Sequence, residues 1–226
     1  CVCLCFDTGR AAPEELRVFG PSSLWALRGG GGVTTVRGEA PPHDFEAYAA
    51  VPIAFQVERA LIWTPQLGPL AFREEALASP WLKDYDLEPG AHPTSWPDRF
   101  DTARWHVFTA HQATAHVGGL VLILGSAEIE MLEGRTDLAL IWDLRVAPEA
   151  RGSGVGRALL HEAETLALAH GCSELKVETQ NINTGACRFY ARAGFELRSI
   201  DHSAYPGLPD EIQMLWYKSL LNVRVK

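Results

Sequence analysis

The amino-acid sequence predicts an α+β fold in which a mixed, mainly antiparallel central sheet is flanked by helices. The first observation is a pair of short apolar segments, residues 105–110 and 115–124, which are typical of successive strands in an antiparallel meander. The second is an ordered series of strand, helix, strand and helix at residues 138–146, 154–170, 174–179 and 183–193. A glycine-rich turn joins the first strand of this series to its helix.

The bulk composition is typical of a soluble globular protein. The formal net charge of −8 argues against a nucleic-acid partner, and it suits small cationic substrates, although the same charge also serves solubility alone. No stretch reaches the roughly 18–20 apolar residues of a membrane span. Five cysteines are not typical of a secreted disulfide framework, so we expect a cytoplasmic protein without a membrane partner. A homodimer is left open.

The first fifty residues differ in kind from the rest of the chain. Residues 29–32 are four consecutive glycines, and Pro41 and Pro42 follow. We therefore expect residues 1–50 to be a weakly structured extension and residues 51–226 to be the folded domain. The Cys-x-Cys-x-Cys spacing of residues 1–5 has no nearby further ligand, and no basic lead precedes an apolar core, so neither a metal site nor a signal peptide is predicted.

Residues 51–137 carry weaker signals. Alternation around Phe55 and Val57 predicts a strand that ends at Pro65. Residues 80–101 are rich in Pro, Asp and Trp and predict a long loop, either a binding loop or an irregular segment whose aromatic side chains hold it to the core. Three histidines at five-residue spacing share no face, so no metal cluster is expected from His106, His111 and His116.

Residues 138–146 read as a strand with two different faces. Strict alternation assigns Leu138, Leu140, Trp142, Leu144 and Val146 to one face and Ala139, Ile141, Asp143 and Arg145 to the other. Asp143 lies in the middle of this apolar strand. A carboxylate there is costly unless it is paired or used.

The turn from Arg151 to Arg157 predicts an anion site. Its glycines allow close approach of the backbone to phosphate, and the following helix presents its positive N-terminus. A nucleoside-triphosphate loop would need Lys and then Ser or Thr after its last glycine, where Arg157 and Ala158 stand. The glycines recur at two-residue spacing, which differs from the dinucleotide fingerprint. Two flanking arginines favour a diphosphate bound without metal.

The order of two motifs resembles the GNAT superfamily, the Gcn5-related N-acetyltransferases. The chain has R-G-S-G-V-G-R-A-L at residues 151–159 and N-T-G-A-C-R-F-Y-A-R-A-G-F at residues 183–195. Residues 137–220 are also similar to streptothricin acetyltransferases, through the run 177–191 and the tail from Tyr205 to Lys218. The likeness does not extend to residues 51–100, where part of a substrate pocket would lie.

This resemblance implies a GNAT-type fold, with a helix pair after the first strand, and acetyl-CoA as co-substrate without a metal. It implies that Asn183 contacts the cofactor arm, although Asn is also a good helix N-cap. The implied cofactor-binding residues are Leu144, Val146, Arg151, Gly152, Ser153, Gly154, Val155, Gly156, Arg157 and Asn183. Tyr190 matches the general acid that returns a proton to the departing thiolate, although its helical spacing also suits a core position.

Attack on a thioester requires a neutral amine, so a group must accept a proton from the ammonium form. Asp143 and Glu178 are the candidates, and either carboxylate could instead bind the substrate cation or pair with an arginine. The sequence thus predicts acetyl-CoA-dependent acetylation of a primary amine on a small cationic molecule such as a streptothricin-like antibiotic. A protein or peptide N-acetyltransferase and a CoA-binding module without turnover remain the alternatives.

Overall fold

The protein is described by a computed structural model over residues 25–29 and 32–221, which form an eight-stranded sheet and a separate two-stranded ribbon. The strand order is β1-β2-β5-β6-β7-β8-β10-β9, and only the β7–β8 pair is parallel. This arrangement confirms the predicted α+β class with a mainly antiparallel sheet. The sheet strands are β1 (Trp25–Gly29), β2 (Gly32–Glu39), β5 (His106–Gln112), β6 (Ala115–Leu124), β7 (Leu138–Val146), β8 (Glu174–Gln180), β9 (Glu196–Asp201) and β10 (Gln213–Ser219).

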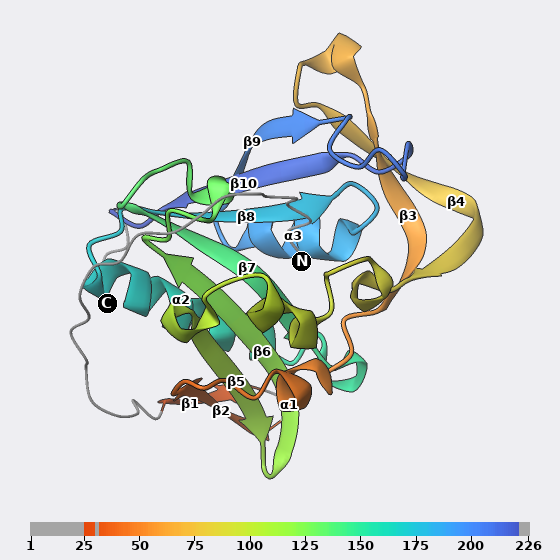
Figure 1. The fold of residues 1–226 in the computed structure, drawn as a ribbon. Coiled ribbons are helices and arrows are strands. Elements are labelled where there is room, and N and C mark those ends of the chain that lie inside the picture. Colours follow the sequence, from red (N-terminus) through yellow and green to blue (C-terminus); the bar gives the residue numbers. More distant parts are fainter. Residues whose placement is uncertain (1–24, 30–31, 222–226) are drawn as a thin grey trace.

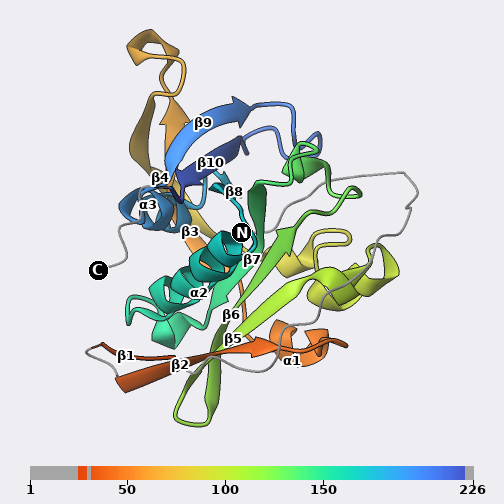
Figure 2. The same cartoon turned by 90° about the vertical axis from the view of Figure 1, so that its left-hand side faces the viewer.

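Three helices and the ribbon complete the described chain (Figures 1 and 2). The helices are α1 (Phe45–Ala49), α2 (Val155–Ala169) and α3 (Thr184–Arg192). The ribbon consists of β3 (Phe55–Trp63) and β4 (Phe72–Lys83), and it extends outward beside β9, β10 and α3 in Figure 1. None of the helices in the described ranges is both long and apolar enough to cross a membrane.

Each face of the sheet is covered by its own apolar core. One core joins α2 and α3 to the sheet through residues such as Leu159, Tyr190 and Val177. The other is rich in aromatic side chains: Tyr48 of α1 packs there against Trp96, which in turn contacts Trp142. The central strands are therefore buried on both sides, which explains why β7 is apolar along most of its length.

Two adjacent glycines of β6 allow these cores to approach the sheet closely. A Cβ atom on Gly118 would lie 2.8 Å from Val155 of α2, and one on Gly119 would lie 2.4 Å from the ring of Tyr48. Any larger residue would therefore push away a helix on one face or an aromatic ring on the other. The sequence around Gly118 and Gly119 gave no sign of this packing role.

A β-bulge in β7 overturns the predicted division of its faces. Val121 of β6 pairs with Asp143 and Leu122 pairs with Ile141, so Trp142 is an extra residue in the register. Leu138, Leu140 and Trp142 pack in the aromatic core as predicted, but Leu144 and Val146 pack against the α2 side. The prediction from strict alternation was wrong for Leu144 and Val146, because the bulge turns two consecutive residues toward the same face and so reverses the alternation after it.

Three other expectations need correction. No helix pair follows the first strand in the described chain: α1 has five residues and leads directly to β3. Residues 32–49 are not an extension, because β2 pairs with β5 and α1 packs in the aromatic core, whereas residues 1–24 lie outside the described ranges, as do the cysteines of residues 1–5. The segment 80–101 begins as the end of β4 and not as a loop; beyond β4 it runs in 3-10 turns, and the fully buried Trp96 holds it to the core, as the second of its two alternatives predicted.

Candidate functional site

A cavity opens where β7 and β8 part. Their parallel pairing ends at Ile141 and Val177. Beyond this point Leu144 and Val146 line a cavity of about 690 Å³, which is in the usual size range of small-molecule sites. Its other walls come from the beginning of β3, the glycine loop, α2 and α3.

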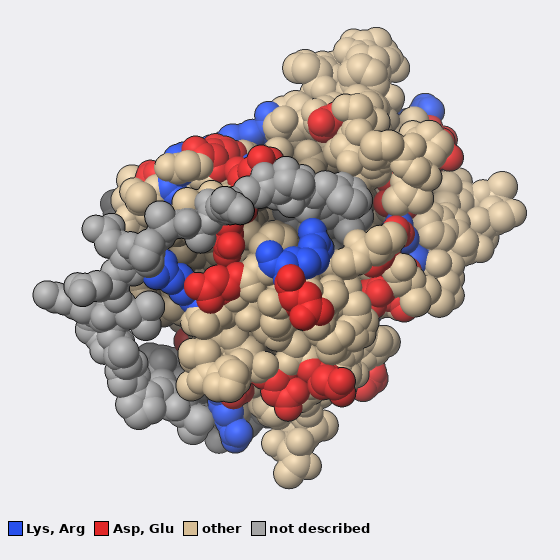
Figure 3. Space-filling model, in the orientation of Figure 1, with Lys and Arg blue, Asp and Glu red and all other residues tan. Residues whose placement is uncertain are grey.

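Six arginines line this cavity, although the whole chain has a formal net charge of −8. They come from β3, β7, the glycine loop, α2 and α3, and they are Arg59, Arg145, Arg151, Arg157, Arg188 and Arg192. The single carboxylate among the described lining residues is that of Glu58. In Figure 3, by contrast, Asp and Glu are spread over the visible face and Lys and Arg form small patches. The cavity is therefore suited to a ligand with several negative charges.

The glycine loop has the backbone geometry of an anion site. Gly152 and Gly154 have φ values of +79° and +98°, a region that other residues rarely adopt. A Cβ atom on either glycine would meet nothing within 4 Å, so the loop faces open space at both positions. Gly154 is the N-cap of α2, which places the helix N-terminus at the cavity.

The side chains of Ser153 and Val155 point away from the cavity. The hydroxyl of Ser153 donates to the carbonyl oxygen of Ala150 at 2.7 Å and accepts from Gln112 at 3.2 Å. Val155 is buried in the core on the α2 side. Of the predicted cofactor residues, these two could contribute only main-chain groups. The other eight all line the cavity.

The first turn of α3 also contributes to the cavity wall. Asn183 caps the helix, because its side-chain oxygen accepts from the backbone N–H of Ala186 at 3.0 Å, and it lines the cavity as well. Tyr190 lines the cavity from the same helix and packs edge-on against Phe189 and Phe195. Its hydroxyl makes no hydrogen bond within the described chain. Burial, followed by the charge of Asp143, raises the pKa of Tyr190.

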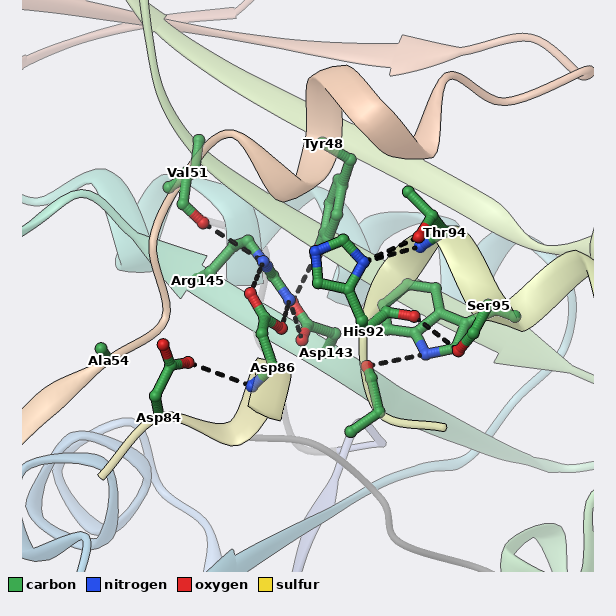
Figure 4. Close-up of polar contacts among 12 residues, drawn as sticks. Tyr48, Val51, Ala54, Asp84, Asp86, His92, Thr94, Ser95, Asp143 and Arg145 are labelled. Carbon is green, nitrogen blue, oxygen red and sulfur yellow. Dashed lines mark hydrogen bonds and ion pairs between the residues drawn. The ribbon is translucent and has the colours of Figure 1, made fainter. Parts of the chain in front are cut away.

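Asp143 is held in a buried ion pair (Figure 4). Its two oxygens accept from Nε and Nη2 of Arg145, both at 3.0 Å, and Oδ1 also accepts from the hydroxyl of Tyr48 at 2.6 Å. Burial alone would raise the pKa of Asp143, but the charge and hydrogen bonds of Arg145 hold that pKa below its usual value. Asp143 does not line the cavity, so it has little capacity to accept a proton there.

Glu178 belongs to a buried chain of hydrogen bonds between β8 and the segment before β10. Its carboxylate accepts from Tyr205 at 2.6 Å and from Gln213 at 2.7 Å. The hydroxyl of Tyr205 in turn accepts from Gln180 at 2.9 Å, and the side-chain oxygen of Gln180 accepts from Tyr85. Glu178 is 2% exposed and lies outside the cavity lining, so a proton could reach it only through such partners.

The sequence analysis missed two sets of cavity residues. Arg188 and Arg192 are four residues apart on α3, so helical spacing could have placed them together on one face of that helix. Arg59 and the wall formed by Ile53 and Phe55 carry no comparable signal. They reach the cavity only because the ribbon folds back onto α3, and no local pattern encodes that contact.

The ribbon is fastened to α3 by shared ionic and main-chain contacts. Glu74 of β4 accepts from Arg59 at 2.6 Å and from Arg188 at 2.7 Å. The backbone N–H of Leu61 donates to the carbonyl oxygen of Asn181 at 2.9 Å, and the side chain of Asn181 donates back to the carbonyl oxygen of Leu61 at 3.1 Å. These contacts hold the cavity wall in place.

A family model described as the acetyltransferase (GNAT) family matches residues 78–195, just over half of the 226 residues. Streptothricin acetyltransferase A of Bacillus subtilis (strain 168) is 43% identical over 81 residues, which cover 35% of this chain and 47% of that relative. The chain thus spans about half the length of that relative. Streptothricin acetyltransferase of Streptomyces lavendulae is 28% identical over 80% of this chain and 92% of its own length.

One solved structure supports the fold. An acetyltransferase from Bacillus anthracis str. Ames, crystallised in complex with acetyl coenzyme A, superposes with a TM-score of 0.65. It is 23% identical, and the match covers 82% of this chain and 98% of that protein. At this identity the likeness establishes a common fold.

Proposed function

Because the family match covers more than half of its length, the chain belongs to the GNAT acetyltransferase family, and we propose that it N-acetylates a primary amine on a small cationic molecule of the streptothricin type. The observation that carries this proposal is the cavity between β7 and α3. It brings together an open glycine loop, six arginines and Tyr190. The acetyl donor in this proposal is acetyl-CoA.

The residues present fit acetyl-CoA. Its phosphates need several cationic and main-chain N–H donors, and the cavity offers both in the glycine loop and the arginines. Arg157 is exposed and makes no ion pair or hydrogen bond with other described residues, so its guanidinium is available. Leu144 and Val146 lie beyond the point at which β7 leaves β8, where strand-like pairing with an extended amide arm is feasible. Bound acetyl-CoA would supply the thioester.

Tyr190 is proposed to protonate the departing thiolate. Its raised pKa keeps the hydroxyl protonated, which is the form that can donate. A thiolate in equally dry surroundings would also become more basic: burial raises the pKa of the neighbouring Cys187 thiol to about 11. Burial therefore raises the pKa of both groups, the Tyr190 hydroxyl that donates the proton and the thiol that forms when the thiolate accepts it.

Glu178 is the better of the two candidates for proton acceptance. The lowered pKa of Asp143 makes its carboxylate a weak base, and its hydrogen bonds with Arg145 and Tyr48 occupy both oxygens. Glu178 is proposed to accept the proton of the substrate ammonium through Tyr205, which donates to it directly. Tyr205 also lies outside the cavity lining, so a water molecule must carry the proton from the ammonium to its hydroxyl, which then passes its own proton to Glu178.

The streptothricin-type acceptor is supported by the two curated relatives, which are named as streptothricin acetyltransferases. The formal net charge of −8 also favours the approach of a cationic acceptor. The test is a thiol-release assay with acetyl-CoA and a panel of amines that includes a streptothricin, free lysine, spermidine and peptides with free N-termini. We expect the streptothricin to give the highest kcat/KM.

A pair of glycine variants controls this assay. Gly154→Val introduces a side chain at a positive φ inside the anion site, whereas Gly134→Val does so at φ +66° in a loop outside the cavity lining. Both positions have open space around the Cβ. Only the first variant should lose thiol release and CoA binding. Preferred turnover of peptides would instead identify a peptide N-acetyltransferase, and CoA binding without thiol release from any amine would identify a binding module.

A further inference from the structure

The segment Val51–Ala54, which links α1 to β3, is fastened to the end of β7 by two arginines. The carbonyl oxygen of Val51 accepts from Nη1 of Arg145 at 3.2 Å, and the carbonyl oxygen of Ala54 accepts from Nη2 of Arg151 at 2.8 Å. Figure 4 shows Arg145 beside this segment, with Val51 and Ala54 along it. Both bonds are made by main-chain acceptors.

Arg145 is a fixed anchor for this segment. Its five N–H donors are all used: by Asp143 from Nε and Nη2, by Asp86 from Nη1 and Nη2, and by Val51 from Nη1. Its side chain has no exposed surface. A guanidinium with every donor satisfied by fixed partners has little freedom to change its geometry.

Arg151 makes the second attachment, and it does so with the side chain that the sequence assigns to phosphate. Its Nε donates to the carbonyl oxygen of Val146 at 3.0 Å, while Nη2 reaches Ala54. One side chain therefore joins three pieces of the site: the glycine loop, the last residue of β7, and the segment before β3. No described carboxylate forms an ion pair with it.

The attached segment forms a wall of the reaction site. Ile53 and Phe55 line the cavity, as do Leu144 and Val146 of β7. The distance between these two walls is therefore set by the bonds that Arg145 and Arg151 make across them. Both arginines line the cavity, but Arg145 also belongs to a larger buried cluster, so Arg151 is the attachment that can be removed without disturbing that cluster.

We propose that Arg151 is a positioning residue that holds the Ile53–Phe55 wall against β7 for the acceptor amine, and that Arg157 rather than Arg151 supplies the phosphate-binding guanidinium. This inference rests on the proposed function, because it assigns the wall to the acceptor. Its experiment also has readouts that need no acceptor.

Four variants distinguish an arginine that bridges two carbonyl oxygens from one that binds phosphate through its charge. They are Arg151→Gln, Arg151→Lys, Arg157→Gln and Arg157→Lys. A lysine keeps the charge and can replace arginine at a phosphate, but it cannot bridge two carbonyl oxygens in the fixed geometry of a guanidinium. The measurements are the CoA dissociation constant by calorimetry, hydrogen exchange of peptides covering residues 51–59, and the KM and kcat for the best amine of the panel.

For Arg151 we expect both variants to leave the CoA dissociation constant within about threefold of the wild type. Both should speed hydrogen exchange over residues 51–59 and raise the acceptor KM about tenfold, the effect of losing two hydrogen bonds. For Arg157 we expect Gln to weaken CoA binding about tenfold and Lys to restore it, with exchange over residues 51–59 unchanged.

The inference is overturned if Arg151→Gln weakens CoA binding as much as Arg157→Gln and Arg151→Lys restores it. It is also overturned if exchange over residues 51–59 is unchanged in both Arg151 variants. Neither result depends on an acceptor. If no amine is acetylated, the proposed function fails while these two measurements still decide the role of Arg151. If an amine is acetylated and its KM does not change in the Arg151 variants, the acceptor role of the wall is wrong.

Discussion

Asp143 and Arg145, two residues apart on β7, form a two-bond ion pair with both side chains wholly excluded from solvent. Residues i and i+2 of a strand point to the same face, which lets Asp143 and Arg145 meet. The pair continues to Tyr48 of α1 and to Asp86, so it connects the central strand to two segments distant in sequence. The Asp143–Arg145 pair therefore holds three segments of the fold together.

Asp143→Asn should destabilise the protein by about 3–5 kcal/mol, because it leaves the buried Arg145 with one carboxylate fewer. Chemical denaturation with urea measures this loss. Glu75→Gln is the control, since its ion pair with Arg73 is exposed and should contribute about 1 kcal/mol or less. A stable Asp143→Asn protein with abolished turnover would restore Asp143 as the proton acceptor.

Gly119→Ala should cost about 1–3 kcal/mol through overpacking. The added methyl would lie 2.4 Å from a ring atom of Tyr48, and the ring is fully buried. Because the hydroxyl of Tyr48 bonds to Asp143, displacement of the ring also weakens the ion pair. Gly38→Ala provides the comparison, as its nearest atom would be 3.9 Å away. Equal midpoints for the two variants in thermal unfolding would contradict this packing analysis.

Tyr190→Phe should lower kcat by roughly 10²-fold and leave the CoA dissociation constant nearly unchanged, because general acid catalysis typically contributes that much. Stability should change little, since the hydroxyl has no hydrogen bond within the described chain. Stopped-flow or steady-state thiol release gives kcat. Tyr217→Phe is the matched control outside the cavity lining. Full activity of Tyr190→Phe would show that its role is packing alone.

His106 should make the protein less stable in mild acid. Burial, together with the nearby His170 and His43, lowers the pKa of His106 to about 4 from 6.5. Between these two pH values the unfolded chain takes up a proton that the folded chain does not, so stability falls as pH falls from about 6.5 to about 4. The loss is about 1–3 kcal/mol for this mostly buried group.

Urea unfolding at several pH values between 7.5 and 4.5 tests the role of His106. His106→Gln should flatten the pH dependence of the unfolding free energy, while His202→Gln, at an exposed position, should leave it as in the wild type. Identical slopes for His106→Gln and the wild type would mean that other groups cause the acid sensitivity.

Local pattern predicted the elements that form most of the cavity wall. Residues 138–146 form β7 at the predicted bounds, and the helices expected at 154–170 and 183–193 are α2 and α3, each shorter at its ends by one residue. The signals were strong because each is local: alternating apolar residues, Gly171 after one helix, and Asn183 capping the next. The two motifs also led to the GNAT family.

Local pattern failed where a contact between distant segments decides the structure. The bulge at Trp142 turns Leu144 and Val146 toward the α2 side, and it depends on the register with β6. The pairing of β2 with β5 likewise joins two strands that are about seventy residues apart in the sequence. Arg59 and Arg188, which are far apart in the chain, meet through Glu74.

The sequence by itself determined the glycine loop at the N-terminus of α2, because such a loop is encoded within a few consecutive residues. It also determined the family. Only the tertiary structure decided which partners each polar side chain has there. Whether Asp143 is a base or an ion-pair partner, and whether Arg151 faces a phosphate or the carbonyl of Ala54, depends on which distant groups the fold brings within hydrogen-bond distance.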